Sequence, residues 1–227
     1  MTDNHTRYTT AALIPAAGSG TRLAMGPKAF IKLGGKTLLE RSVHSFADVV
    51  DERIVAVSED MYDEARALLP EDVKLIVGGS SRQESVYALL QASSADIVLI
   101  HDAARPFLAK RLIETLKTTV IERGAASLAM AVADSLVEAD TGKTVSREGL
   151  RAVQTPQAFW RQDIVAAHEH AQCNFLTGTD DASLLRYSGG TVELVQGSTC
   201  LFKITTRADF ELAQALVHTW DSATDRF

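Results

Sequence analysis

Small residues and two cations gather near the start of the chain in a pattern suited to binding an anion. Small side chains let main-chain N–H groups approach an anion closely, and arginine and lysine supply the charge that phosphate oxygens need. A triphosphate is therefore a candidate ligand. The residues concerned are Ala16, Ala17, Gly18, Arg22 and Lys28.

Two common phosphate-binding motifs do not fit this loop. A dinucleotide fingerprint needs a third glycine at the position of Leu23. A Walker A motif ending at residues 35–37 needs a glycine at the position of Phe30. A glycine-rich turn that binds nothing stays open as an alternative for this loop alone, so other segments must decide.

A second candidate segment contains adjacent glycines before a predicted helix. Gly79 follows a predicted strand, and Ser85 falls in the first turn of the helix. Main-chain groups and a hydroxyl at these positions can read the edge of a pyrimidine base. In the alternative, Ser80 or Ser81 only caps the helix. That alternative explains a serine but leaves the paired glycines without a reason.

Asp102 follows an apolar segment at 97–100, so its carboxylate should lie at the carboxyl end of the sheet, where open α/β folds bind ligands. Mg²⁺ prefers one or two carboxylates together with substrate phosphates, so Asp102 either binds Mg²⁺ directly or holds a substrate hydroxyl. Arg105 is expected to orient this loop by pairing with a carboxylate or a phosphate, with a surface ion pair as the alternative.

The elements that must position these residues follow an alternating pattern. Short β-branched segments alternate with segments of helical period, which predicts a Rossmann-like α/β fold with a mostly parallel, twisted sheet flanked by helices. We expect strands at 11–15, 54–58, 74–77, 97–101 and 127–132. Helices are expected at about 37–46, 61–69, 82–91 and 110–123. A last helix after Thr206 should bury Phe210, Ala213, Val217 and Trp220 on one face.

The polar segment 134–151 interrupts this alternation. A turn signal at 140–143 is flanked by two short apolar pairs, which predicts a β-hairpin arm projecting from the domain. An isolated two-stranded ribbon is marginal in water, so the arm needs a partner surface. A symmetric dimer offers one through the same contact on both subunits, and we therefore expect a homodimer.

Composition limits the classes of protein to which the chain can belong. With 227 residues it fits one domain, spanning 1–227 with the arm inside it. The net charge of -6 argues against a general nucleic-acid binder, so any phosphate ligand must be held by local cations. Two cysteines without metal-ligand spacing suit a reducing cytosol. We expect a cytoplasmic protein that binds neither nucleic acid nor membrane.

Five segments, taken together, resemble one enzyme family. The loop at 16–22 with Pro27-Lys28 is similar to the signature of sugar-nucleotide pyrophosphorylases. Four further segments, at 78–86, 101–106, 154–157 and 179–183, narrow the resemblance to the family of 2-C-methyl-D-erythritol 4-phosphate cytidylyltransferases. These enzymes serve non-mevalonate isoprenoid synthesis. The resemblance runs from about Ala11 to Val217 in order and without a large insertion.

The resemblance implies that the chain transfers CMP from CTP to a polyol phosphate and releases pyrophosphate. It assigns Gly79 and Ser85 to the cytosine and places Thr155 in the substrate site. The arm is implied to reach across a dimer and cover the neighbouring acceptor site, with Arg147 matching a family arginine and Ser135 standing where threonine is usual. Lys203, expected in a short strand, matches a lysine before the last helix. The resulting catalytic set is Arg22, Lys28, Arg147 and Lys203.

Three alternatives stay open. A related cytidylyltransferase acting on ribitol 5-phosphate shares the first loop, but it typically carries valine at the position of Ala104. A non-catalytic nucleotide-binding regulator of the same fold would have no need to keep the cations and Asp102 together. A nicotinamide oxidoreductase is possible on fold alone, although the missing glycine at Leu23 counts against it.

Overall fold

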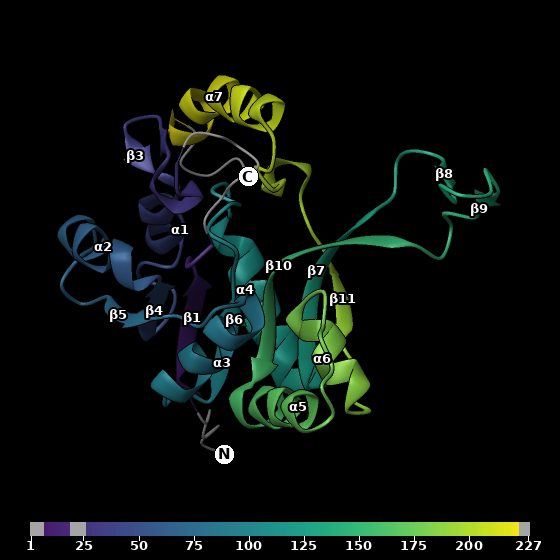
Figure 1. Ribbon diagram of the computed structural model, residues 1–227, viewed down its shortest axis with the longest axis horizontal. Coiled ribbons are helices and arrows are strands. Elements are labelled where there is room, and N and C mark those ends of the chain that lie inside the picture. Colours follow the sequence, from purple (N-terminus) through teal and green to yellow (C-terminus); the bar gives the residue numbers. More distant parts are fainter. Residues whose placement is uncertain (1–6, 19–25, 223–227) are drawn as a thin grey trace, which may run out of the picture.

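A seven-stranded sheet forms the centre of the computed structural model, which describes residues 7–18 and 26–222 (Figure 1). From one edge to the other the strands are β11 (Glu193–Gln196), β7 (Ala125–Ala131), β10 (Arg151–Trp160), β6 (Ile97–Ile100), β1 (Thr10–Pro15), β4 (Glu52–Val57) and β5 (Lys74–Val77). Neighbours pair in parallel, except that β10 runs antiparallel to both β6 and β7. The mostly parallel α/β sheet expected from the sequence is confirmed.

Helices cover both faces of this sheet, which is why its central strands are apolar throughout. In β1, Ala12 and Ile14 join the core under α1 (Leu38–Ser45), α2 (Tyr62–Leu68) and α4 (Lys110–Arg123). The alternate residues Ala11 and Leu13 join the core under α3 (Arg82–Ala92), α5 (Arg161–Cys173) and α6 (Asp181–Tyr187). Successive strand residues point to opposite faces, so one short strand supplies both cores.

The last helix, α7 (Arg207–Ser222), packs away from the sheet. It buries Phe210, Ala213 and Val217 against Phe107 and Ile31, with Trp220 half-buried beside them. The apolar face expected for this helix is therefore confirmed. Outside the arm, the shorter elements of the described residues are β2 (Lys32–Leu33), β3 (Lys36–Thr37) and the 3₁₀ turns η2 (Lys28–Phe30), η3 (Glu59–Met61) and η4 (Thr199–Leu201).

The expected strands and helices agree with the structure to within two residues at each end, except for the strand expected at Lys203, and neither β10 nor β11 was among the expected strands. Lys203 does not lie in a strand: residues 202–205 form no regular element, and Ile204 donates one hydrogen bond to the carbonyl of Ala104. Strand β10, for which the sequence provided no expectation, contains Pro156. The register of β10 against β7 shifts between Val153 and Gln157, where a residue without an N–H is tolerated in a sheet.

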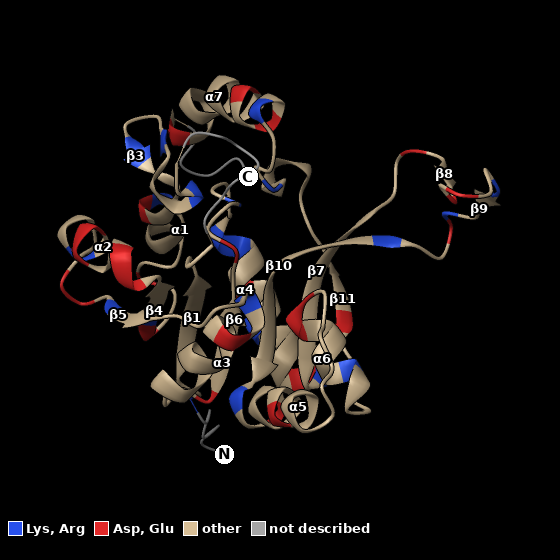
Figure 2. Ribbon diagram, in the orientation of Figure 1, with Lys and Arg blue, Asp and Glu red and all other residues tan. Residues whose placement is uncertain are grey.

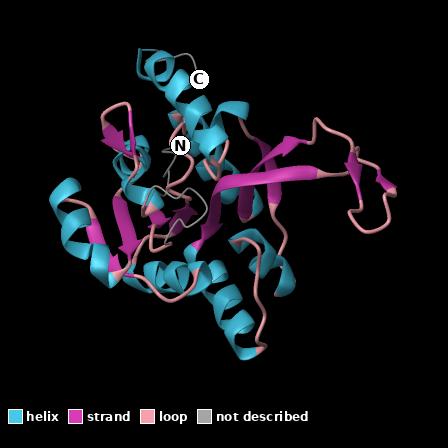
Figure 3. Cartoon of the chain, turned by 45° about the horizontal axis from the view of Figure 1, so that its top comes forward, coloured by secondary structure: helices cyan, strands magenta, loops and turns pink. Residues whose placement is uncertain are grey.

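The arm leaves the body between β7 and β10 and ends in a small hairpin, as Figures 1 and 3 show. Strand β8 (Leu136–Val137) pairs antiparallel with β9 (Thr144–Val145). In the turn, the Gly142 N–H donates to the Glu138 carbonyl, and Gly142 adopts a φ of 68°, which favours glycine. Charges of both signs lie along the arm (Figure 2). Within the described ranges, no helix has the length and apolar character needed to cross a membrane.

Candidate functional site

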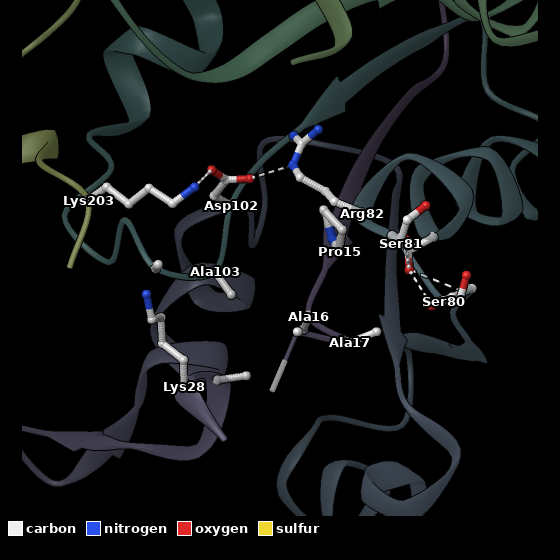
Figure 4. A pocket seen from close by; sticks show the side chains of 15 residues that line it. Pro15, Ala16, Ala17, Lys28, Ser80, Ser81, Arg82, Asp102, Ala103 and Lys203 are labelled. Atoms are coloured by element: carbon white, nitrogen blue, oxygen red, sulfur yellow. Dashed lines mark hydrogen bonds and ion pairs between the residues drawn. The ribbon is translucent and has the colours of Figure 1, made fainter. Parts of the chain in front are cut away.

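A cavity of about 360 Å³ opens at the carboxyl ends of β1, β5 and β6. This is the edge at which open α/β sheets bind ligands. Figure 4 shows side chains from several loops turned toward this space. Its lining consists of Pro15, Ala16, Ala17, Gly18, Lys28, Ala29, Gly79, Ser80, Ser81, Arg82, Ser85, Asp102, Ala103, Ala104 and Lys203.

The wall that follows β1 is built from the predicted phosphate loop. The Ala16 N–H donates to the Ala56 carbonyl at 2.7 Å, which continues the parallel pairing of β1 with β4 one residue past the strand. Lys28 begins η2 and lines the same cavity (Figure 4). Ala16, Ala17, Gly18 and Lys28 are thus brought together, whereas Arg22 lies outside the described residues and keeps the role predicted from the sequence.

The wall that follows β5 depends on the paired glycines. A Cβ at Gly78 would lie 2.8 Å from the Ser85 Oγ, and one at Gly79 would lie 2.4 Å from the Glu84 Cβ. Both positions must therefore lack a side chain for the loop to pack on α3. The expectation that a capped turn alone leaves the glycines without a reason is wrong, because close packing on the helix supplies one.

Ser85 is buried and already bonded within this loop. Its hydroxyl donates to the Ser81 carbonyl at 2.8 Å and accepts from the Gly79 N–H at 3.1 Å. Ser81 caps α3 by accepting from the Glu84 N–H. The hydroxyl therefore fixes the main chain of Gly79, and the main-chain groups form the rigid edge that faces the cavity.

Asp102 lies between two cations at the end of β6. Its Oδ1 accepts from Arg82 Nε at 3.1 Å, and its Oδ2 accepts from Lys203 Nζ at 2.7 Å (Figure 4). Burial acts to raise the pKa of Asp102, but the positive charges of Arg82 and Lys203 outweigh it and lower the pKa well below its usual range. The cavity therefore has an ionised carboxylate in its wall.

Thr155 and His101 fix the main chain of Asp102 from below. The Asp102 N–H donates to Thr155 Oγ1 at 3.0 Å, and that hydroxyl lies 3.3 Å from His101 Nδ1. His101 Nε2 lies 3.1 Å from the Arg105 carbonyl. Burial lowers the pKa of His101 to about 4, so the ring is neutral, with Nε2–H donating to the carbonyl and Nδ1 accepting from Thr155.

Arg105 bonds main-chain carbonyls from two other segments, and its pairing with a phosphate stays a prediction. Its Nη1 donates to the Leu201 carbonyl at 2.8 Å and its Nη2 to the Val153 carbonyl at 3.5 Å. The guanidinium thus ties the loop after β6 to β10 and to η4, the turn that precedes Lys203. It orients the loop through these carbonyls and does not line the cavity.

Ser135 and Arg147 lie on the arm, apart from the cavity of the same chain. Both are exposed, and the Arg147 guanidinium donates to the Ala133 carbonyl within the arm. Neither residue lines the cavity. Within one chain the structure therefore brings Lys28, Lys203 and Asp102 together and leaves Arg147 outside.

Two charged residues, Arg82 in the cavity wall and Asp181 beneath it, were not assigned to the site from the sequence. Arg82 bonds Asp102, and its Nη2 lies 2.9 Å from Asp181 Oδ2. Asp180 does cap α6, accepting from the Ser183 N–H, but its neighbour Asp181 is buried. Arg82 could have been recognised from its place in the family-like segment 78–86. Asp181 could not, because a sequence does not show which side chain of an Asp-Asp pair points inward.

The described residues contain no cluster of three or more histidine, cysteine or acidic side chains that could hold a metal. Asp102 is the ionised carboxylate of the cavity wall, and a carboxylate has about four lone-pair sites, of which two are used here. Arg82 and Lys203 would repel a metal ion at Asp102 unless negative charge were added to the site. The donor set therefore fits Mg²⁺ when substrate phosphates supply the remaining oxygens and negative charge.

The site combines a loop of small residues, the cavity and a carboxylate between cations at the carboxyl edge of a Rossmann-like sheet. This arrangement is typical of a nucleotidyltransferase. A family model for 2-C-methyl-D-erythritol 4-phosphate cytidylyltransferase matches residues 10–219. The chain belongs to this family.

Individual relatives agree with this assignment. The enzyme of that name from Deinococcus radiodurans is 50% identical over 210 residues, which covers 91% of this chain and 89% of the relative. A Thermus thermophilus counterpart is 40% identical and covers 92% and 98%.

Solved structures show the same fold. The crystal structure of the enzyme from Thermus thermophilus superposes with a TM-score of 0.82 at 38% identity, covering 92% of this chain and 99% of that one. A 4-diphosphocytidyl-2C-methyl-D-erythritol synthase from Anaerococcus prevotii gives a TM-score of 0.83 at 27% identity, covering 93% and 96%.

Proposed function

We propose that the chain transfers the CMP part of CTP to 2-C-methyl-D-erythritol 4-phosphate, giving 4-diphosphocytidyl-2-C-methyl-D-erythritol and pyrophosphate. The observation that carries this proposal is the cavity itself, in which Lys28 and Lys203 line the same space as the loop after β1 and Lys203 bonds the ionised Asp102. The family match over residues 10–219 favours this acceptor over ribitol 5-phosphate.

The reaction requires the protein mainly to align the two substrates and to stabilise negative charge. An acceptor phosphate is already ionised at neutral pH, so no general base is needed. One of its oxygens forms a bond to the α-phosphorus of CTP while the bond from that phosphorus to the β-phosphate oxygen breaks, and the electron pair leaves with pyrophosphate. Lys28 and Arg22 would neutralise the triphosphate and the transition state, and Lys203 would hold the acceptor phosphate beside Asp102.

We further propose that Mg²⁺ enters with CTP. Asp102 is the residue that would hold it, and a bound Mg²⁺ would supply positive charge to the phosphate oxygens. Gly79 and Ser85 would present main-chain groups to the cytosine, and Thr155 would keep the Asp102 loop in place.

The assembly proposed is a cytoplasmic homodimer. Ser135 and Arg147 are exposed on an arm that their own cavity does not use. We propose that the arm of a second copy places them over the acceptor site, where Arg147 would hold the acceptor phosphate together with Lys203.

Pyrophosphate release tests the function directly. With Mg²⁺ and 2-C-methyl-D-erythritol 4-phosphate, CTP should be used far better than ATP, GTP or UTP, because a rigid edge around Gly79 reads the exocyclic amine and carbonyl of cytosine. Ribitol 5-phosphate in a parallel assay serves as the control acceptor and should be used poorly. Equal turnover of UTP, or a preference for ribitol 5-phosphate, would contradict the proposal.

A further inference from the structure

A line of charged and polar side chains runs beneath the cavity, from α5 to the end of β6. His168 Nε2 lies 3.3 Å from Asp181 Oδ1, and Asp181 Oδ2 lies 2.9 Å from Arg82 Nη2. Arg82 Nε then donates to Asp102 at 3.1 Å. Only the last members of this line touch the cavity, because His168 is fully buried and Asp181 is 1% exposed.

Asp181 and Arg82 both carry charge. Burial acts to raise the pKa of Asp181, but the charge of Arg82 outweighs it and lowers the pKa. Burial acts to lower the pKa of Arg82, and Asp181 and Asp102 together raise it. Desolvating such a pair cancels much of its attraction, so net stability is a weak reason for its presence. Its effect lies in where it holds the guanidinium.

The guanidinium of Arg82 is divided between two carboxylates. Nε and Nη2 form one edge of the planar group, and such an edge can take both oxygens of a single carboxylate in a bidentate pair. Here Nε bonds Asp102, while Nη2 lies beside Asp181. In this arrangement Arg82 makes a single hydrogen bond to Asp102 and no bidentate pair, while the negative charge of Asp181 attracts Nη2 and Oδ2 of Asp102 bonds Lys203.

We propose that Asp181, held by His168, is a positioning residue for the transfer reaction: it draws one nitrogen of Arg82 away from Asp102 and so keeps Lys203 on the acceptor side of that carboxylate. The kinetic part of this inference rests on the proposed function, since it takes Asp102 and Lys203 to face the acceptor. The geometric part, the placement of Arg82 and Lys203 around Asp102, does not depend on the reaction.

A crystal structure of the Asp181→Asn variant tests the geometry without any assay. The amide keeps the size of the side chain but loses the charge that holds Arg82 Nη2. We expect Arg82 to bind both oxygens of Asp102 and Lys203 Nζ to move beyond hydrogen-bond distance of Oδ2. If Arg82 and Lys203 keep their wild-type contacts, the inference is wrong.

Kinetic measurements on the same variant test the consequence. Because misplacing a reacting group by about 1 Å can cost about a hundredfold, we expect kcat/KM for the acceptor to fall at least about tenfold. The Kd of CTP, measured by calorimetry, should change less than about threefold. The control is Asp221→Asn at the far end of α7, which removes a carboxylate from the buried Arg41 and should leave both values unchanged.

A double-mutant cycle shows whether Asp181 acts through Arg82. Arg82→Lys keeps a positive charge opposite Asp181, so the variant should fold, but one ammonium lacks the planar edge that two carboxylates share. In this background Asp181→Asn should lower kcat/KM for the acceptor by less than about a further twofold. The positioning role would be refuted if the two substitutions lowered kcat/KM for the acceptor independently, so that their effects multiplied. It would also be refuted if Asp181→Asn, like Asp221→Asn, left kcat/KM unchanged.

Asp102→Asn separates the two proposals. If wild-type protein releases no pyrophosphate, or if Asp102→Asn is fully active, the proposed function of this carboxylate fails, and the crystal structure alone decides the inference. If Asp102→Asn is severely impaired while Asp181→Asn is not, the function stands and the positioning role falls.

Discussion

Single residues from distant parts of the chain define the charge of the cavity. Asp102 follows β6, Arg82 begins α3 and Lys203 follows η4, yet the carboxylate bonds both cations. Lys28 enters from a fourth segment. Because each cation is fixed by its own loop, removing one should weaken the chemistry without loosening the core.

Lys28→Ala is expected to lower kcat by a factor of several hundred, which corresponds to about 3–4 kcal/mol for one preorganised group that stabilises transition-state charge. The melting temperature should change little, because Lys28 lies on a loop outside the core clusters. Lys32→Ala, an exposed lysine in β2, is the matched control and should be fully active. A Lys28→Ala protein with wild-type kcat would show that the loop has been misassigned.

His101 predicts a pH dependence of stability. Its folded-state pKa is about 4, below the ordinary value of 6.5, so the unfolded chain binds more protons between these values. The free energy of unfolding should therefore fall as pH is lowered from 6.5 to 4, by at most about 1.4 kcal/mol per pH unit from this group. Urea unfolding at several pH values measures the slope.

The His101→Gln variant should show a shallower slope over the same range, whatever its absolute stability, because glutamine does not titrate. Because the other titrating groups contribute to both slopes, equal slopes in the two proteins would show that the pKa of His101 is not lowered by folding.

Among the secondary-structure elements, strand β10 connects the arm to the cavity. It begins at Arg151, where the arm ends, and contains Thr155, which accepts from the Asp102 N–H. Arg105 also contacts its main chain at Val153. The position of the arm and the position of the Asp102 loop thus depend on one strand.

Arg147→Ala is expected to raise the KM for the acceptor about tenfold or more, the scale of a lost hydrogen bond to a charged group, while the KM for CTP stays nearly constant. The reason is that Arg147 would meet the acceptor phosphate and not the nucleotide. Lys143→Ala removes a cation from the turn of the same arm and should change neither KM. An equal rise in both KM values would count against this placement.

The regular elements could be predicted from the sequence because their apolar patterns are local. Residues 110–123 form α4 as expected, and β1 differs from its expected bounds by one residue. Strand β10 could not be predicted, because Pro156 argues against a central strand unless the register shift beside it is known. Lys203 was assigned to a strand because its segment alternates apolar and polar residues, a pattern that does not show whether the segment pairs with a neighbouring strand.

In the candidate site, too, residues with a local sequence signal could be predicted and residues that meet through tertiary packing could not. Motif residues that follow strands, such as Gly79 and Asp102, line the cavity as expected. Arg82 and Asp181 were not recognised as a pair because they are far apart in the chain and meet only through the packing of α3 against α5 and α6.

At the scale of the whole molecule, the proposed dimer makes each site depend on two chains. Mixing Lys28→Ala with Arg147→Ala protein should then restore activity, because a mixed dimer has one site with both defects and one with neither. Random exchange of equal amounts would restore about a quarter of the wild-type sites. Subunit exchange is verified with two affinity tags. Exchange without recovered activity would mean that each site is completed within its own chain.

The arm is also the covalent link between two strands that are already neighbours in the sheet. β7 and β10 pair from Ala125 opposite Phe159 to Ala131 opposite Arg151, so hydrogen bonds hold them together without the arm. A protease that cuts the exposed turn at 140–142 should therefore leave the fold intact. Produced as two polypeptides, 1–141 and 142–227, the protein should reassemble through this strand pair, and co-elution on size exclusion would detect it.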